Sequence, residues 1–196
     1  MSRLEPLERA SVPELEEFFA LAEGAMGFLP NSMRIMARRP ELVKAFTGLM
    51  GQVNLGHSLT GGLDRMVAYM ASRSAGCLYC QAHTHHGAAQ AGDLAAEKLD
   101  SIWDYETSPL FSEGERAALR VAQLAAQVPN GVEDADFEAL KAHFTEEQVV
   151  DIVAIISAFG FLNRWNDTFA TPLEEAPEAH AEAKLAKSGW TAGKHA

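Results

Sequence analysis

Hydrophobic residues recur along the chain at the three- and four-residue spacing of amphipathic helices, and the alternating pattern of strands is almost absent. Proline or a polar N-cap residue marks successive helix starts at Ser11, Pro30, Pro40, Thr60, Ser112 and Thr145. Glycines end several of these segments, as Gly76 does just before the cysteines and Gly92 does at the end of the following helix. The pattern therefore predicts an all-α fold.

The apolar residues of the helix expected over 145–169 surround most of its circumference, so we expect it to be the most buried element. From Pro172 onward the composition changes to Glu, Ala and Lys, followed by Gly189 and Gly193. This change predicts a single all-helical domain over residues 1–171 and a loosely attached C-terminal tail over 172–196. The Ala-rich centre of that tail is expected to form a short surface helix.

Charge excludes several classes of partner. The 196 residues include 16 Lys and Arg against 27 Asp and Glu, a net charge of −11. So acidic a chain is a poor match for nucleic acid or for an anionic membrane surface. The first twenty residues lack the apolar core of a signal peptide, and the longest apolar run, 149–162, is too short to span a bilayer. These features predict a soluble, cytoplasmic protein without nucleic-acid or membrane partners.

The two cysteines of the chain, Cys77 and Cys80, form a single C-x-x-C. In a reducing compartment this motif is typical of redox or metal sites rather than of a disulfide framework. Because Gly76 ends one helix, Cys77 is expected in the first turn of the next, where free N–H groups and the helix dipole favour a thiolate and lower a cysteine pKa. Residues i and i+3 share a face, so the pair could close a disulfide, and His83 could accept a thiol proton.

Two other interpretations of this segment stay open at this point. A zinc ion would use Cys77 and Cys80 with two imidazoles. The candidate imidazoles are His57, His83, His85 and His86. Alternatively, the cysteines are two small buried side chains with surface histidines beside them. The redox interpretation is favoured because a thiolate, a second thiol and a proton acceptor stand together, and no G-x-G-x-x-G motif follows a strand to indicate a nucleotide or flavin cofactor.

The stretch 72–84, Ser-Arg-Ser-Ala-Gly-Cys-Leu-Tyr-Cys-Gln-Ala-His-Thr, resembles the core of the alkyl hydroperoxidase D (AhpD)-like, carboxymuconolactone decarboxylase superfamily. The stretches Gly27–Asn31 and Phe161–Asp167 also resemble its peroxidase-related branch, so that the similarity spans about residues 25–173. The resemblance implies an all-α homo-oligomer, a trimer or hexamer, that reduces hydroperoxides. It further implies that Cys80 is the peroxidatic thiolate. Cys77 is then its disulfide partner, re-reduced by a lipoyl or thioredoxin-like dithiol protein.

Two positions depart from the pattern of that family. Its histidine usually stands four residues after the second cysteine, where this chain has Thr84, and His83 is offset by about 100° around a helix. Its proton-relay glutamate stands twelve residues before the first cysteine, where this chain has Arg65. Arg65 could favour a thiolate by its charge but cannot shuttle protons at neutral pH. Redox activity of the cysteine pair is thus implied more directly than peroxidase activity.

The expected function is a hydroperoxide reductase with Cys80, Cys77 and His83 as its catalytic residues. One alternative is a protein with a structural zinc, and another is a decarboxylase or isomerase that uses His83 or His57 as a base. Other polar residues are expected to be structural: Asp151 at an oligomer contact or a water, and Asn163, Arg164, Asn166 and Asp167 as helix-end residues.

Overall fold

The computed structural model describes residues 2–196, and within this range the chain forms α-helices and short 3-10 turns but no strand, which confirms the predicted all-α class. The α-helices are α1 (Glu16–Met26), α2 (Asn31–Met36), α3 (Pro40–Leu55), α4 (Leu63–Ser74), α5 (Leu78–Ala91), α6 (Ala96–Asp100), α7 (Glu113–Ala125), α8 (Asp134–Lys141), α9 (Glu146–Phe169) and α10 (Glu175–Leu185).

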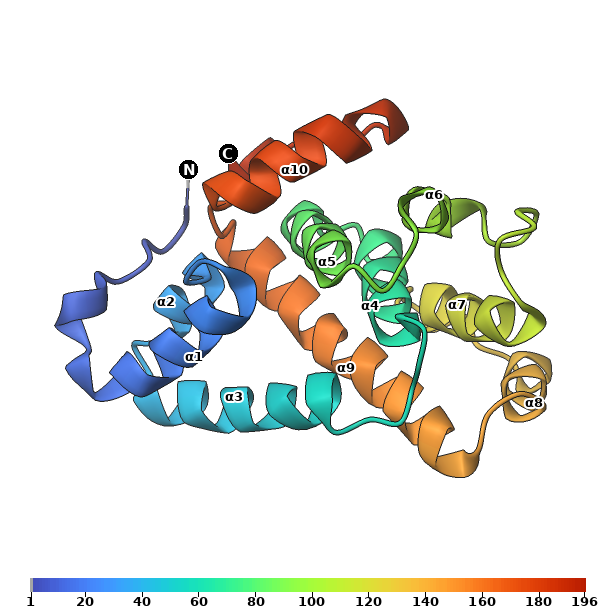
Figure 1. The fold of residues 1–196 in the computed structure, drawn as a ribbon. Helices are drawn as coiled ribbons and strands as arrows, with labels where there is room; N and C mark the ends of the chain where they lie inside the picture. The colour runs from blue at the N-terminus through green and yellow to red at the C-terminus, as the bar shows by residue number, and fades with distance from the viewer. Residues whose placement is uncertain (1) are drawn as a thin grey trace.

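The long helix α9 runs diagonally through the molecule and contacts α3, α4, α5, α7 and α8 (Figure 1). Helices α4 and α5 pack against each other and against α9, while α1 to α3 lie on one side and α6 to α8 on the other (Figure 1). The main hydrophobic core lies between α4, α7 and α9, with fully buried residues such as Met66, Met70, Leu119, Ile152 and Ile155. This arrangement places the start of α5 close to the C-terminal end of α9.

The helix starts read from the sequence are largely confirmed. Ser112 and Thr145 each form a capping box, in which the side chain accepts from the N3 backbone N–H and the N3 side chain accepts in return. The sequence pattern did not identify the short helices α6 and α8, because neither carries enough apolar positions to show a period.

The prediction that α9 is the most buried helix is wrong. Eight of the 12 residues of α4 are buried, against seven of the 24 of α9. Apolar residues on α9 such as Val150 and Phe161 are exposed by 66% and 40% because, within residues 2–196, no element covers that side of the helix. Apolar residues around a whole helix indicate burial only if every side has a partner.

The C-terminal segment, 172–196, is packed onto the domain rather than loosely attached. Helix α10 packs across α5, and its residues Pro177, Ala181 and Leu185 are buried (Figure 1). Beyond α10, the Trp190 indole N–H donates to the Leu78 carbonyl at 3.0 Å. The Arg3 backbone N–H donates to the Phe169 carbonyl at 2.9 Å, so the described N-terminal residues lie on the same side of the molecule as the C-terminal segment (Figure 1).

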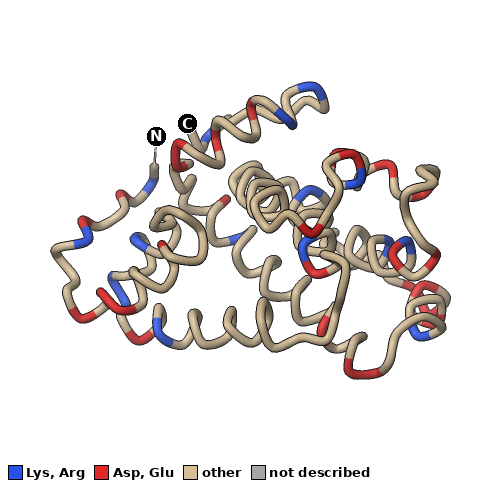
Figure 2. The backbone as a smooth tube through the Cα atoms, viewed as in Figure 1, with Lys and Arg blue, Asp and Glu red and all other residues tan. Residues whose placement is uncertain are grey.

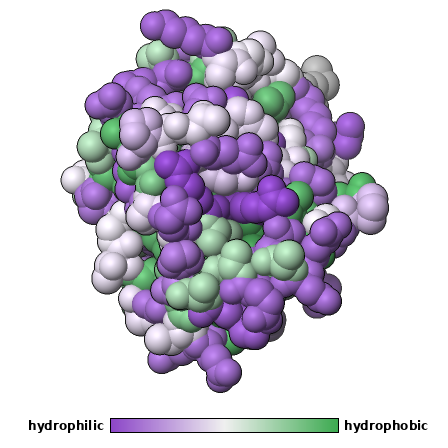
Figure 3. Space-filling view, turned by 90° about the vertical axis from the view of Figure 1, so that its right-hand side faces the viewer, coloured by the Kyte–Doolittle hydropathy of each residue, from purple (hydrophilic) through white to green (hydrophobic). Residues whose placement is uncertain are grey.

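Charged residues are distributed mainly at the periphery, and α5 and most of α3 carry none (Figure 2). The face formed by α6 to α8 is predominantly hydrophilic with scattered apolar side chains (Figure 3). Within residues 2–196, α9 alone is long and apolar enough to cross a membrane, and here it is a partly buried helix that contacts five others. The cytoplasmic location stays a prediction.

Candidate active site at the start of α5

Cys77 and Cys80 lie at the N-terminus of α5. Gly76 adopts a left-handed φ of +75°, which only glycine takes without strain, and this turn ends α4 and starts α5. Cys77 is the N-cap residue, and its Sγ accepts a hydrogen bond from the Cys80 backbone N–H at 3.4 Å. Both side chains are buried, exposed by 1% and 3%. The turn thus holds two reduced thiols one helical turn apart, facing the same side.

Burial, rather than the helix dipole, dominates the ionisation of Cys80. Burial and the neighbouring Cys77 thiol raise the pKa of Cys80 well above its usual value, and the Asn166 amide, which donates to Cys80 Sγ at 3.5 Å, opposes this only in part. The expected lowering of a cysteine pKa is therefore wrong for Cys80. Asn166, expected to be only a helix-end residue, is itself buried and directed at the thiol.

His83 belongs to a buried hydrogen-bonded group that also contains Glu174 and Tyr79. Its Nε2 pairs with Glu174 Oε2 at 2.6 Å, and its ring stacks on Tyr79 with centroids 4.1 Å apart. The other Glu174 oxygen accepts from the Tyr79 hydroxyl at 2.9 Å and from the Asn31 backbone N–H. Burial alone would raise the pKa of Glu174, but His83 and these donors hold it below its ordinary value. The group therefore contains a buried carboxylate–imidazole pair.

A second imidazole approaches the cysteines from the other end of the chain. His195 is fully buried, and one of its ring nitrogens, a carboxylate oxygen of Asp167 and the Sγ of Cys77 all lie within 4.8 Å of one another. His195 Nδ1 donates to the Thr171 carbonyl at 2.8 Å, and Nε2 lies 3.6 Å from Asp167. Burial lowers the pKa of His195. The neutral imidazole is therefore its stable form near neutral pH.

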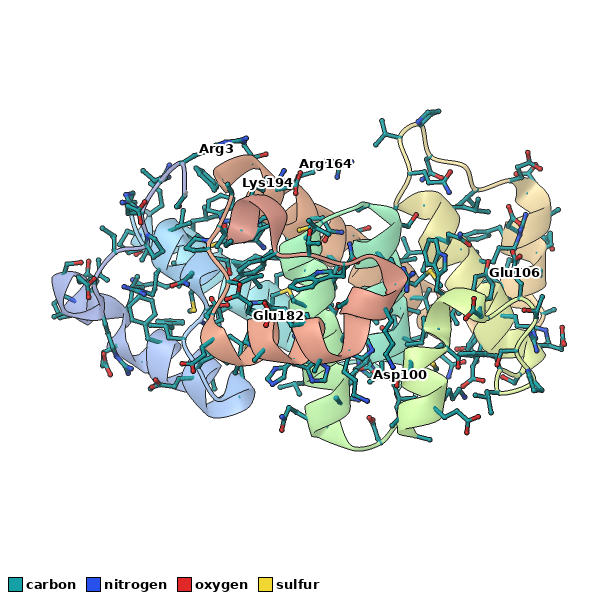
Figure 4. The ribbon with its side chains drawn as sticks, turned by 90° about the horizontal axis from the view of Figure 1, so that it is seen from above. Arg3, Asp100, Glu106, Arg164, Glu182 and Lys194 are labelled. Atoms are coloured by element: carbon teal, nitrogen blue, oxygen red, sulfur yellow. The ribbon has the colours of Figure 1, made fainter. Side chains whose placement is uncertain are left out.

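A zinc site would require histidine ligands, but the candidate histidines pair with other side chains. His83 binds Glu174, His85 Nδ1 lies 2.9 Å from His180, and His57 lies 3.4 Å from Asp64. Among residues 2–196, the set whose donor atoms lie close enough to share a metal ion is Cys77, Asp167 and His195. Asp167 is already paired with Lys194 at 2.6 Å (Lys194 is labelled in Figure 4), so the set fits proton transfer better than a divalent cation.

The two remaining sequence candidates lie away from the thiols. Arg65, at the position of the family's relay glutamate, is partly exposed and pairs with Asp93 at 2.5 Å. Asp151 accepts from the Ser58 backbone N–H at 3.2 Å and so holds the loop between α3 and α4. Neither residue takes part in the cysteine site. The expected contact of Asp151 with an oligomer partner or a water stays a prediction.

A cavity of 430 Å³ lies beside α9, and Asp167 is one of its lining residues. One end is apolar, with Val128, Val153 and Ile156, and the other is polar, with Arg164 and Asp167. Neither sulfur lines the cavity, but Asp167 borders both the cavity and the Cys77–His195 cluster. Arg164 lies on the same part of the molecule as Lys194 (Figure 4). The volume suits a small molecule with one apolar and one polar end.

Sequence reasoning found the cysteines and His83 but missed Glu174 and His195. Both lie in the segment interpreted as a tail, 91 positions after His83 and 118 positions after Cys77 by residue number. A carboxylate just before an Ala-rich helix is an ordinary N-cap signal, and a histidine next to the C-terminus carries no periodic signal at all. Only the packing of α10 on α5 brings them to the site.

Comparison with known proteins identifies related chains. Residues 40–124 match the carboxymuconolactone decarboxylase family. An 80-residue alignment with the uncharacterized protein YnjA of Escherichia coli (strain K12) is 34% identical and covers 41% of this chain and 44% of that one. The aligned part thus spans less than half the length of that curated relative.

Solved structures align over nearly the whole chain. The debrominase Bmp8, crystallised as a cysteine-to-alanine variant with 2,3,4-tribromopyrrole, is 33% identical with a TM-score of 0.87, covering 92% of this chain and 96% of that one. A peroxidase-related protein with an alkylhydroperoxidase AhpD core from Ralstonia eutropha JMP134 is 26% identical with a TM-score of 0.76, covering 90% and 94%. The similarity therefore extends well beyond residues 40–124 of the family match.

Proposed function

Because the chain belongs to the carboxymuconolactone decarboxylase family, with the C-x-x-C pair of its AhpD-like members, we propose that it is a dithiol oxidoreductase. The Cys77–Cys80 pair gives two electrons to a small substrate and becomes a disulfide. The observation that carries this proposal is the buried C-x-x-C turn at the N-terminus of α5, where Asn166 donates to one sulfur and an imidazole lies near the other. That combination supplies a nucleophile, a second thiol and proton-transfer groups.

The first proposed substrate class is a hydroperoxide. Cys80 attacks the O–O bond and becomes a sulfenic acid while the alcohol leaves, and Cys77 then displaces the oxygen to close the disulfide with release of water. His83, paired with Glu174, is proposed to assist proton transfer to the leaving alkoxide. A lipoyl or thioredoxin-like dithiol protein returns the pair to the reduced state by thiol–disulfide exchange.

A second candidate is removal of a halogen from a small ring. It is favoured by one observation, the 33% identity to a debrominase over 92% of the chain, against 26% to the peroxidase-related protein. In this reaction the two thiols reduce a carbon–halogen bond to a carbon–hydrogen bond and yield a disulfide, a halide ion and a proton.

The experiment presents the reduced protein with one equivalent of cumene hydroperoxide or, separately, of a brominated pyrrole. Disulfide formation with the peroxide and no bromide release supports the hydroperoxidase, and the reverse supports the dehalogenase. A Cys77→Ser, Cys80→Ser double variant is the control for background reaction. If neither compound oxidises the thiols of the native protein, the proposed function is wrong.

We also propose that a second copy of the chain covers the open side of α3 and α9. An apolar groove of 390 Å³ lies there, and Leu49 and Phe161 on its walls are exposed by 52% and 40%. Light scattering should therefore give a mass above 21.2 kDa, and Phe161→Glu should lower it. A monomeric native protein would exclude this assembly.

A further inference from the structure

The end of the chain is held against α5 so that His195 meets Cys77. The Leu173 backbone N–H donates to the His195 carbonyl at 2.8 Å, and Lys194 pairs with Asp167 at 2.6 Å. Gly193 packs so closely that a Cβ there would lie 2.9 Å from Leu78 Cδ1. Together with the Trp190 hydrogen bond, these contacts fix the position of the last residues. His195 is therefore placed as firmly as a residue of the core.

The hydrogen bonds of His195 define which of its nitrogens is available. Nδ1 donates its proton to the Thr171 carbonyl, because a carbonyl oxygen can only accept. In the neutral ring Nε2 then carries a lone pair. This atom is buried, has no hydrogen-bond partner within residues 2–196 and lies 3.6 Å from Asp167. One nitrogen of the same ring lies within 4.8 Å of the Cys77 sulfur. A buried acceptor that is left without a hydrogen bond costs stability, and the Cys77 S–H is a donor close to this ring.

We propose that His195 is the proton acceptor for Cys77 and returns that proton to the oxygen that leaves when the disulfide closes. The inference rests on the proposed dithiol chemistry. The S–H bond of Cys77 breaks and an N–H bond forms at Nε2. The Cys77 thiolate attacks the sulfur of the Cys80 sulfenic acid, the S–O bond breaks, and the leaving hydroxide takes the proton from Nε2 to form water. No further oxidant or reductant is required.

The surrounding charges support both ions of this pair. Cys77 is the N-cap of α5, so its sulfur faces the positive end of the helix dipole and already accepts the Cys80 N–H. Asp167 on α9 stabilises a protonated His195, while Lys194 on the same segment opposes it. Tyr79 on α5 lies with its ring centroid 5.9 Å from that of His195 and adds no charge near neutral pH. The separation of up to 4.8 Å allows transfer through one water or after a small rotation.

The test isolates Cys77 in a Cys80→Ser background and measures its alkylation by iodoacetamide from about pH 5 to about pH 10. Ultraviolet thiolate absorbance is recorded in parallel. His195→Asn is the main variant, because asparagine keeps a donor towards Thr171 but has no base at the Nε2 position. His195→Gln is a second variant in case the first fails to fold. His85→Asn is the matched control, since His85 is equally buried but has no thiol beside it.

We expect His195→Asn to lower the alkylation rate at pH 7 about tenfold and to move the midpoint of the pH profile up by about one unit, with the same plateau at high pH. His85→Asn should leave the profile within about twofold. An unchanged profile, an equal loss at every pH, or stoichiometric zinc held by the native protein would overturn the proposal. Because no peroxide or halide is used, this result is independent of whether the proposed substrate is correct.

Discussion

His195 and His85 are two buried histidines with closely similar surroundings. They are exposed by 0% and 1%, and the Nδ1 of each has a partner, the Thr171 carbonyl at 2.8 Å or the His180 ring at 2.9 Å. Within residues 2–196 the Nε2 of each has no hydrogen-bond partner, and each lies 3.6 Å from an aspartate oxygen. Burial lowers the pKa of both, that of His85 to about 4.

The two histidines differ in what else is near them. His195 is adjacent to the Cys77 sulfur, whereas His85 packs edge-on against the Tyr69 ring at 5.1 Å and joins α5 to α10 through His180 (Asp100, its aspartate neighbour, is labelled in Figure 4). His85 is thus a structural link between α5 and α10, whereas His195 is a proposed proton acceptor for Cys77. The chemistry of a buried imidazole depends on the neighbouring group, not on its burial.

The largest effects on turnover are expected from replacing the two cysteines. Cys80→Ser should reduce turnover of the true substrate by at least about 10³-fold, because the attacking thiol is lost. Cys77→Ser should permit a single stoichiometric turnover with hydroperoxide but no disulfide. Steady-state assays and one-equivalent titrations measure these effects. Full activity of Cys80→Ser would contradict the assigned roles.

Replacing the two histidines in turn tests the comparison directly. His195→Asn should lower turnover at pH 7 by about 10²-fold, the size of effect typical of an acid–base group. His85→Asn should change turnover less than about threefold and instead cost about 1 kcal/mol of stability, because the partly buried His180 ring loses its hydrogen-bond partner. Turnover and urea unfolding should be measured on the same preparations. Equal effects of the two variants on turnover would remove the distinction.

The pH dependence of the free energy of unfolding should come mainly from His85. Burial, with the His180 ring, holds the pKa of His85 at about 4 in the folded protein, below its value of 6.5 when unfolded. The unfolded chain therefore binds more protons between these values, and stability that is fully present above pH 6.5 is lost as the pH falls. At pH 5 the loss from His85 alone is about 2 kcal/mol. Urea unfolding at pH 7 and pH 5 measures this loss of stability. His85→Asn should remove the part of the loss that comes from His85. An unchanged pH dependence of stability in that variant would contradict the role given to His85.

A smaller change is expected from the glycine that positions His195. Gly193 has a φ of +56° and lies against Leu78. Gly193→Ala should lower the free energy of unfolding by about 1 kcal/mol through backbone strain, and should slow Cys77 alkylation by displacing the end of the chain. Gly189→Ala, also at positive φ (+87°) but with nothing near its Cβ, is the matched control and should affect stability alone. Equal alkylation rates in the two variants would show that the position of His195 is unimportant.

The sequence predicted much of the fold because local rules decide it. The helix starts at Ser112 and Thr145 and the helix end at Gly76 each depend on a few neighbouring residues, and the structure confirms each. The exposure of one side of α9 was not predictable, because it depends on which elements fold back onto the helix. Periodicity identifies an apolar face but not its partner.

The candidate site was predicted only in its local part. Cys77 and Cys80 were found from their spacing, and the structure places them at a helix start as expected. The raised pKa of Cys80 was missed because burial is a tertiary property that overcomes the helix dipole. Glu174 and His195 were missed because docking of the C-terminal segment, not any sequence motif, brings them to α5. The tail interpretation failed for the same reason.

The central claim is that Cys77 and Cys80 act as a two-electron dithiol. Its most direct test is the intact mass of the reduced protein under non-reducing conditions, before and after one equivalent of an alkyl hydroperoxide and, in parallel, of a brominated pyrrole. The account predicts that one of them causes rapid loss of about 2 Da, with no stable added oxygen, as the disulfide closes. An unchanged mass with both compounds, and both thiols still open to alkylation after unfolding, would contradict it.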